Sequence, residues 1–348
     1  MTFRNSLSRR DLMKLSGNIG LASLVATPFG LAKPAFAQDR QVVLSYFASV
    51  NPQNYGRATG SFEEALSGLA SVAYQGVSSG PDVLTGMASG AIDLGNMGSS
   101  PMIVGMAQGL PVSMVYIHKI IRESEALIVR EGSEISSLED LRGRKVGVPF
   151  NTSVHFAVLA ALDSVGLSIS DVELINLRPD AIAAAWSQGA IDAAYIWTSV
   201  LAKLEEDGGE IIFTSGDLIE QGVLLLDGFV VRDSFKEEHP DLVLACLQEF
   251  ARIDAEFAEN PDEVVETLTD FLQIDRALVQ RFVDTTHSLT PQEQATKEWM
   301  GAPGDTDTGI QMALQKQAQF MLDTNQIMQM PDLTKFIDSS FIAQMVES

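Results

Sequence analysis

Cysteine and histidine are scarce in this chain of 348 residues, which has one cysteine and four histidines. Cys246 lies in an apolar stretch typical of a buried helix, so we expect an inert thiol, and no intrachain disulfide is possible. The histidines, His118, His155, His239 and His287, show no metal-ligand spacing. These shortages argue against a metal centre and against cysteine or histidine chemistry, and we expect no cofactor.

Positive charge is also in short supply, because 46 acidic residues face 23 Lys and Arg and the net charge is −23. Such acidity disfavours nucleic acid and anionic membranes as partners. It also repels a bare anion at long range, so a ligand without net charge, such as a zwitterion, meets less opposition.

The N-terminal segment 1–37 has the pattern of an export signal. Arg9 and Arg10 form a twin-arginine pair, a short apolar stretch follows, and small residues precede Gln38. We expect cleavage after Ala37 and a periplasmic location, with the twin-arginine route favoured. The alternative is a membrane anchor, but the apolar stretch is short and contains glycine, serine and proline.

The residues after the signal exceed one usual core, so we expect two lobes. Short apolar strands alternate with helices from Gln41 to about Phe213, which predicts an α/β fold with parallel-type sheets flanked by helices. The expected strands are 42–48, 71–77, 93–97, 113–118, 145–148, 172–177, 193–197 and 210–213. From about His239 the pattern predicts helices alone, over 240–258, 261–272, 276–285, 291–300, 308–325 and 331–346.

Two stretches resemble each other, residues 125–130 (EALIVR) and 227–232 (DGFVVR). One interpretation is two ordinary buried strands. The other is two strands that cross between lobes, each with an acid at the mouth of a cleft. The second interpretation divides the chain into lobe 1, residues 38–128 plus 229–348, and lobe 2, residues 129–228.

Two hydroxyl-rich turns stand where a strand passes into a helix, at 98–101 (GSSP) and 150–155 (FNTSVH). Hydroxyls and free backbone N–H groups at a helix start bind anions without a formal positive charge. We therefore expect an anionic group to be held from both sides, by the residues Ser99, Ser100, Thr152, Ser153 and His155. Simple helix capping is the alternative for each turn.

Several stretches in order resemble the periplasmic taurine-binding proteins, the solute-binding components of ABC importers, within the wider group for alkanesulfonates and nitrate. They are DLGNMGSSP (93–101), SEAL (124–127), VPF (148–150), LINLRP (174–179), IAAAW (182–186), DAAYIW (192–197) and DGFVVR (227–232). The resemblance implies a two-lobed periplasmic binding protein fold that closes on its ligand and performs no chemistry. It implies delivery to an inner-membrane permease with its ATPase, and we expect a monomer.

Taurine joins a sulfonate to an ammonium, so its site needs anion donors, carboxylates and an apolar wall. Asp227 and Glu125 are the candidates for the ammonium, because each begins an expected crossing strand. Trp197 follows a strand at its carboxyl end and can offer an aromatic face. Asn51 and Gln53 are possible polar contacts, in a segment more polar than the resemblance leads us to expect.

Three other functions stay open. The same fold can bind an alkanesulfonate, a sulfate ester or another small zwitterion, and the acids Asp227 and Glu125 distinguish these from taurine by whether they face the cleft. A biosynthetic enzyme of the thiamine-pyrimidine synthase type is a remote alternative, disfavoured by the signal and the sparse histidines. A secreted sensor is the third.

Overall fold

The computed structural model describes residues 40–347. The expected export signal and the cleavage after Ala37 lie outside these residues. None of the helices within 40–347 is both long and apolar enough to cross a bilayer.

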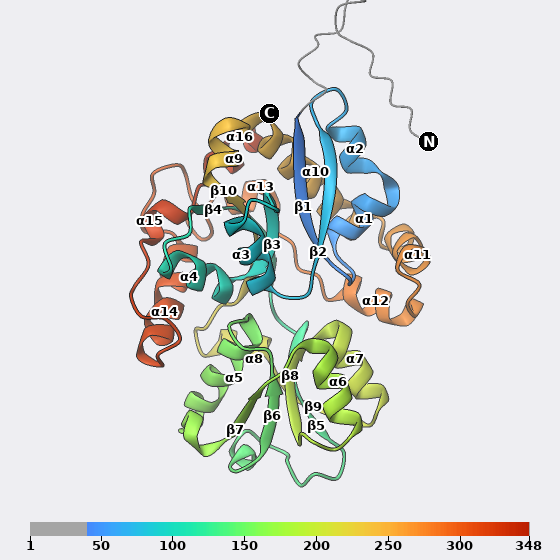
Figure 1. The fold of residues 1–348 in the computed structure, drawn as a ribbon, viewed down its shortest axis with the longest axis vertical. Helices are drawn as coiled ribbons and strands as arrows, with labels where there is room; N and C mark the ends of the chain where they lie inside the picture. The colour runs from blue at the N-terminus through green and yellow to red at the C-terminus, as the bar shows by residue number, and fades with distance from the viewer. Residues whose placement is uncertain (1–39, 348) are drawn as a thin grey trace, which may run out of the picture. The chain divides into compact units, whose positions relative to one another are not determined.

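The first sheet has five strands in the order β2-β1-β3-β10-β4 (Figure 1). Its strands are β1 (Gln41–Phe47), β2 (Ser71–Val77), β3 (Leu94–Gly98), β4 (Val112–Ile120) and β10 (Leu226–Arg232). β1 pairs parallel with β2 and β3. β3 is buried along its whole length and β4 nearly so, and neither shows the polar–apolar alternation of a half-exposed strand.

The second sheet also has five strands, in the order β7-β6-β8-β5-β9. They are β5 (Glu125–Arg130), β6 (Lys145–Val148), β7 (Glu173–Asn176), β8 (Ala193–Trp197) and β9 (Gly209–Thr214). β6 pairs parallel with β7 and β8. The strands expected from the sequence are confirmed to within a few residues.

Both sheets are mixed, and the expected α/β fold of sheets flanked by helices is confirmed. β10 runs antiparallel to β3 and β4, and β5 runs antiparallel to β8 and β9. A parallel pair needs a crossover, usually through a helix packed on the same sheet. The chain instead enters β5 directly from β4 of the first sheet, and it enters β10 after the short helix α8 that follows β9 of the second.

Helices cover both faces of each sheet (Figure 1). Around the first sheet, up to β4, they are α1 (Pro52–Thr59), α2 (Ser61–Ala65), α3 (Gly80–Ala88) and α4 (Ser99–Ala107). Around the second they are α5 (Ser153–Ser164), α6 (Pro179–Ser187), α7 (Thr198–Glu206) and α8 (Ser215–Glu220), with the short 3-10 helices η2 (Glu139–Leu141) and η3 (Ile169–Asp171). Trp186 of α6 is fully buried.

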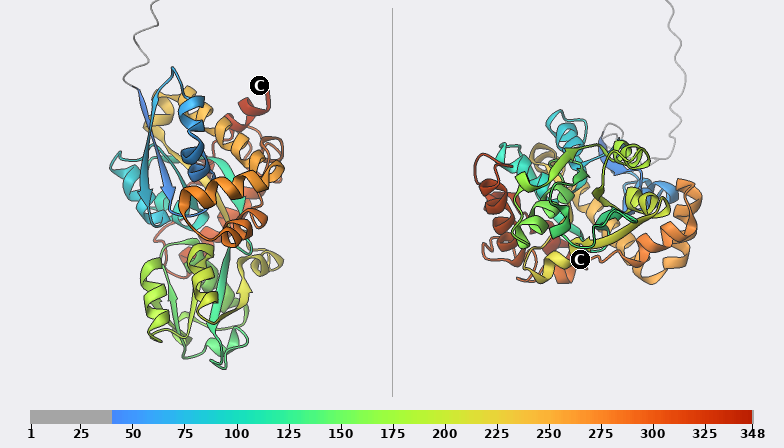
Figure 2. Two further views of the ribbon diagram at one scale, coloured as in Figure 1. Left: turned by 90° about the vertical axis from the view of Figure 1, so that its right-hand side faces the viewer. Right: turned by 90° about the horizontal axis from the view of Figure 1, so that it is seen from below.

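The segment after β10 is helical and gathers mostly around the first sheet (Figure 2). Its helices are α9 (Asp233–Glu238), α10 (Pro240–Glu259), α11 (Pro261–Leu272), α12 (Arg276–Asp284), α13 (Pro291–Gln294), α14 (Gly309–Asp323), α15 (Leu333–Phe336) and α16 (Ser340–Glu347). Two expected helices are shorter or broken. The helix expected over 291–300 ends at Gln294, and Ile337–Ser339 interrupts the one expected over 331–346.

The residues at these helix ends and breaks pack against the open edge of β4. The side chain of Gln294 bonds the backbone of Ile117, and Asp338 donates its N–H to the carbonyl of Met114 at 2.9 Å. An uncovered edge strand exposes unpaired backbone groups, so irregular backbone here replaces a missing strand. Cys246 lies fully buried in α10, and burial raises the pKa of its thiol to about 12, which confirms the expected inert thiol.

Candidate functional site

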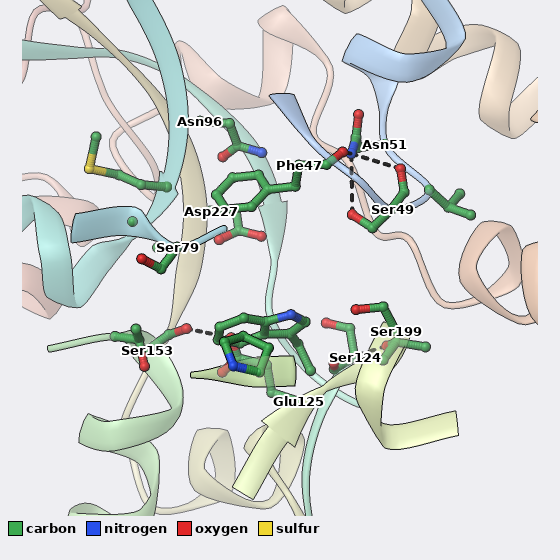
Figure 3. Close-up of a pocket in the computed structure, with 18 of the residues that line it drawn as sticks. Phe47, Ser49, Asn51, Ser79, Asn96, Ser124, Glu125, Ser153, Ser199 and Asp227 are labelled. Atoms are coloured by element: carbon green, nitrogen blue, oxygen red, sulfur yellow. Dashed lines mark hydrogen bonds between the residues drawn. The ribbon is translucent and has the colours of Figure 1, made fainter. Parts of the chain in front are cut away.

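A cavity of about 580 Å³ lies between elements of the two sheets (Figure 3). This volume falls within the range usual for small-molecule sites. Among the residues predicted for the site, Asn51, Glu125, Thr152, Ser153, Trp197 and Asp227 line it, whereas Gln53, Ser99, Ser100 and His155 do not.

Six helices begin at the cavity, which is lined by the N-cap residues of α1, α3, α4, α5, α6 and α7, namely Asn51, Ser79, Gly98, Thr152, Arg178 and Trp197. Of these caps, Asn51 alone makes a side-chain hydrogen bond to its own helix, so the first backbone N–H groups of the other five helices lack that partner. Unsatisfied N–H groups and the positive ends of these helix dipoles make the cavity receptive to an anion.

Ser99 and Ser100 are buried in lobe packing rather than presented to the cavity. Ser100 Oγ accepts a hydrogen bond from Gln317 Nε2 at 2.7 Å, and Ser99 Oγ has no partner. Ser100 thus turns toward α14, and the structure brings neither hydroxyl to the cavity. The residue of that turn that reaches the cavity is Gly98.

The second turn does reach the cavity, with different roles for its side chains. Asn151 adopts a left-handed conformation (φ 61°) that places Thr152 and Ser153 at the start of α5. Thr152 Oγ1 donates to the carbonyl of Pro149 at 2.6 Å, and Ser153 Oγ donates to Glu125 Oε1. Both hydroxyl protons are therefore used inside the protein, and the hydroxyl oxygens are left as acceptors.

His155 lies one turn into α5 and faces inward. Its ring stacks on Phe150 with centroids 4.2 Å apart, and its Nδ1 accepts from the N–H of Asn151 at 3.4 Å. Burial lowers its pKa to about 4, so the imidazole is neutral at physiological pH. The structure does not bring His155 to the cavity, because the helix turns it toward the Phe150 ring.

Glu125 begins β5 and sits at the floor of the cavity with 5% of its surface exposed. Its carboxyl accepts from Ser153 Oγ on one oxygen and from Ser215 Oγ on the other, at 3.4 Å. Its pKa is raised to about 8, chiefly by burial and in part by the neighbouring Asp227, while the serines and Lys119 lower it. With this pKa the carboxyl group is mostly protonated at pH 7.

Asp227 reaches the cavity from the other sheet, at the start of β10 (Figure 3). It forms an ion pair with Lys119 Nζ at 3.5 Å, and the two side chains are 22% and 17% exposed. Nothing in the sequence singled out Lys119, the second-last residue of the mostly apolar strand β4. Its only signal was a lysine in a nearly all-buried run, a place where a charge needs a partner.

Apolar side chains from elements around both sheets line part of the cavity. Trp197 lies directly opposite Glu125 in the β5–β8 pairing, at the carboxyl end of β8. The other apolar residues of the lining are Phe47, Val50, Val77, Val200, Phe257 and Phe282.

Asn51 lines the cavity, but its amide is committed to its own loop. Its Oδ1 caps α1 through the N–H of Asn54 at 2.9 Å, and its Nδ2 donates to the carbonyls of Phe47 and Ser49. Gln53 is 1% exposed, does not line the cavity, and has no partner on either amide atom. The helix geometry of α1 therefore turns Gln53 into the lobe and leaves Asn51 to shape the rim.

The sequence model of the NMT1/THI5-like family matches residues 57–264, more than half of the chain. The chain belongs to this family. The taurine-binding periplasmic protein of Escherichia coli strain K12 is 37% identical over 220 residues, which cover 63% of this chain and 67% of that protein. This match confirms the resemblance found in the sequence.

Two solved structures share the fold of this NMT1/THI5-like chain at low sequence identity. The alkanesulfonate-binding protein SsuA from Xanthomonas axonopodis pv. citri, bound to MOPS, has a TM-score of 0.77 and 19% identity, covering 87% of this chain and 100% of its own. The desulfurization enzyme DSZB has a TM-score of 0.60 and 16% identity, covering 88% and 99%. The fold alone therefore serves both binding proteins and an enzyme, and the cavity must distinguish them.

Proposed function

We propose that this chain is an extracytoplasmic binding protein that captures taurine and delivers it to an ABC permease and its ATPase. The observation that supports this most strongly is the joint presence, in one cavity, of five helix starts without a side-chain cap and two acids. The first feature suits a sulfonate and the second suits an ammonium. The 37% identity to a taurine-binding periplasmic protein supports the same ligand and a periplasmic location after export.

The sulfonate is held, in this proposal, by backbone N–H groups at the helix starts. A partly buried helix N-terminus stabilises a nearby negative charge by up to about 2 kcal/mol. Hydrogen bonds to a charged group add about 1.5–3 kcal/mol each. A few such contacts reach micromolar affinity after the cost of association is subtracted.

The ammonium is held by Glu125 and Asp227, and the indole of Trp197 lies beside it. A cation on the face of a tryptophan gains about 0.5–2 kcal/mol, more as water is excluded. Ammonium binding favours the ionised form of Glu125, so the proton that this carboxyl keeps in the empty site leaves on binding.

Closure of two lobes, one around each sheet, with Asp227 on the first and Glu125 on the second, is the proposed mechanism of capture. The starts of α4 and α5 come close together, since a Cβ placed on Gly98 would lie 3.1 Å from Ser153 Cβ. Arg281 of α12 also pairs with Glu205 of α7. These contacts between elements of the two sheets are the ones that opening would break.

An alkanesulfonate without an amine is the second candidate, and Lys119 favours it. The ammonium of Lys119 already neutralises Asp227, so the cavity can be balanced without a ligand cation. Taurine binding requires a carboxylate that no protein cation already neutralises. Glu125 supports this requirement, because its carboxyl is hydrogen-bonded by the hydroxyls of Ser153 and Ser215 rather than by a lysine.

An enzyme like DSZB finds no support in the cavity lining. The single cysteine, Cys246, is fully buried in α10 and does not line the cavity, and residues 40–347 hold no cluster of metal-binding side chains. We propose binding without chemistry.

Thermal unfolding of residues 38–348 tests the ligand. Taurine at 100 times its dissociation constant raises the unfolding free energy by about 2.7 kcal/mol, an increase of a few degrees in Tm. Sulfate and leucine should leave Tm unchanged. Stabilisation by ethanesulfonate but not by taurine would transfer the assignment to simple alkanesulfonates, and stabilisation by none of them would refute the proposal.

A further inference from the structure

Two neighbouring residues of β4, His118 and Lys119, both line the cavity. Successive residues of a regular strand point to opposite faces, so the strand must be irregular here. Along the β10–β4 pairing, Asp227 lies opposite Lys119, whereas the next residue, Gly228, lies opposite Ile117. His118 is therefore the extra residue of a β-bulge. Bulges are over-represented beside functional sites because they redirect side chains in this way.

The buried amide of Gln294 holds the backbone beside this bulge from the C-terminal segment. Its Oε1 accepts from the N–H of Ile117 at 2.8 Å, and its Nε2 donates to the carbonyl of Ile117 at 3.0 Å. The same Nε2 donates to the carbonyl of Leu289 at 2.9 Å. Both backbone groups of the residue before His118 are thus satisfied, and His118 keeps a defined position at the cavity.

A buried carboxylate sets the orientation of the His118 imidazole. Nδ1 of His118 lies 3.3 Å from Asp254 Oδ1, and Asp254 Oδ2 accepts from the hydroxyl of Tyr116 at 2.9 Å. An ionised carboxylate can only accept hydrogen bonds, so Nδ1 carries the proton that faces Asp254. In a neutral ring Nε2 is then an acceptor, as it is in Ser-His-Asp triads, where a buried aspartate holds the imidazole in this tautomer. Nε2 is also the nitrogen left to face the cavity.

His118 and Asp227 lie on the same face of the first sheet. Phe229, two positions after Asp227 in β10 and therefore on the same face, has its ring centroid 5.9 Å from that of His118. The ammonium of Lys119 contacts Asp227 Oδ2 at 3.5 Å, so Asp227 Oδ1 and His118 Nε2 both remain available as acceptors. Figure 3 shows Glu125 on the opposite side of the cavity from Asp227. A ligand cation between the two acids is therefore within the part of the cavity that His118 lines.

We propose that His118 Nε2 is a third hydrogen-bond acceptor for the ligand's ammonium, beside the carboxylates of Asp227 and Glu125, and that it makes the cavity selective for a primary amine. A primary ammonium has three N–H donors, one for each acceptor, and every N-methyl group replaces one of them. A methyl group turns toward the neutral imidazole, because a lost bond to a carboxylate costs more. This inference rests on the proposed function, and it leaves the sulfonate to the helix starts.

Calorimetry with taurine, N-methyltaurine and ethanesulfonate tests this role in the wild type, His118→Leu and His118→Gln. The matched control is His239→Gln, a histidine that does not line the cavity, and it should bind as the wild type does. Loss of one hydrogen bond to a charged group predicts about 10- to 100-fold weaker binding of taurine to His118→Leu, with ethanesulfonate unchanged. The wild type should prefer taurine to N-methyltaurine by a similar factor, and His118→Leu should bind the two almost equally. His118→Gln, whose Oε1 is an acceptor, should recover part of the loss.

Nitrogen-15 NMR of histidine-labelled protein gives a readout that a purely structural role would not move. In the taurine complex, Nδ1 of His118 should give the signal of a protonated nitrogen and Nε2 that of an unprotonated one. The Nε2 signal should differ between the taurine and ethanesulfonate complexes, because only taurine brings a donor to it. Should both His118 variants fail to fold, these wild-type signals and the wild-type preference for taurine over N-methyltaurine decide.

Three results overturn the acceptor role of His118 alone. They are a protonated Nε2 in the taurine complex, an Nε2 signal that is the same with both ligands, and an unchanged affinity for taurine in a folded His118→Leu. Failure of the wild type to bind taurine overturns the proposed function, and the inference about His118 with it.

Discussion

The affinity for taurine should rise steeply with pH below 8, because the ammonium requires Glu125 in its ionised form. Burial raises the pKa of Glu125 in the empty site from 4.5 to about 8. About one molecule in a hundred is then ionised at pH 6 and about one in ten at pH 7, and apparent affinity scales with that fraction. We expect taurine to bind about tenfold more tightly for each unit from pH 6 to near pH 8, and then to level off.

Calorimetry at pH 6, 7 and 8 measures this slope, and repeating the pH 7 titration in buffers of different ionisation enthalpy counts the released protons. About 0.9 proton per taurine should leave at pH 7. Glu125→Gln serves as the control, because it removes the carboxyl group that holds the proton. It keeps Asp227 and Lys119, the charged groups that act on Glu125, and His118, which also lines the cavity.

Glu125→Gln should weaken taurine and abolish the slope, whereas ethanesulfonate should show no such rise in the wild type. The same group makes the ligand-free protein less stable as pH rises from 4.5 to 8, since the folded state holds a proton that the unfolded state has lost. A pH-independent taurine affinity, or an equal slope in Glu125→Gln, would refute this reasoning.

Two further predictions concern the walls of the cavity. Gly98→Val should weaken taurine binding by about tenfold or more relative to Gly98→Ala. A Cβ at Gly98 already lies 3.1 Å from Ser153 Cβ, so the extra methyl groups of valine obstruct the α4–α5 contact. Calorimetry on both variants checks the order, and equal affinities would contradict it. Trp197→Ala should weaken the binding of taurine by about 3- to 30-fold and that of ethanesulfonate by less, since of the two ligands only taurine has an ammonium to contact the indole. Calorimetric titration of the variant with both ligands tests this. Equal losses of affinity would assign Trp197 to apolar contact alone.

The sequence was sufficient for the strands and for the cavity residues that stand at strand ends. Period-two alternation, apolar runs and helix-starting prolines are local signals, so β1, β6 and β8 could be placed from them. Glu125 and Trp197 could be placed because a strand fixes which end its terminal residues occupy.

What the sequence could not reveal depends on contacts between distant segments. Ser99 and Ser100 looked like ligand donors, but only the packing of α14 shows that Gln317 takes Ser100 Oγ. The strand that contains Lys119 looked purely structural, because its pairing with Asp227 joins residues 108 positions apart. The β-bulge at His118 in β4 leaves no pattern in the local sequence. The sequence therefore could not distinguish His118, which lines the cavity, from the other three histidines.

Binding of taurine and ethanesulfonate to Asp227→Asn tests the central claim most directly, because this variant removes a carboxylate and releases Lys119 in one step. If the cavity binds a zwitterion, taurine should weaken by about 10- to 100-fold while ethanesulfonate binds as well as before or more tightly. Equal weakening of both ligands, or unchanged binding of taurine, would contradict the assignment of an ammonium to these acids.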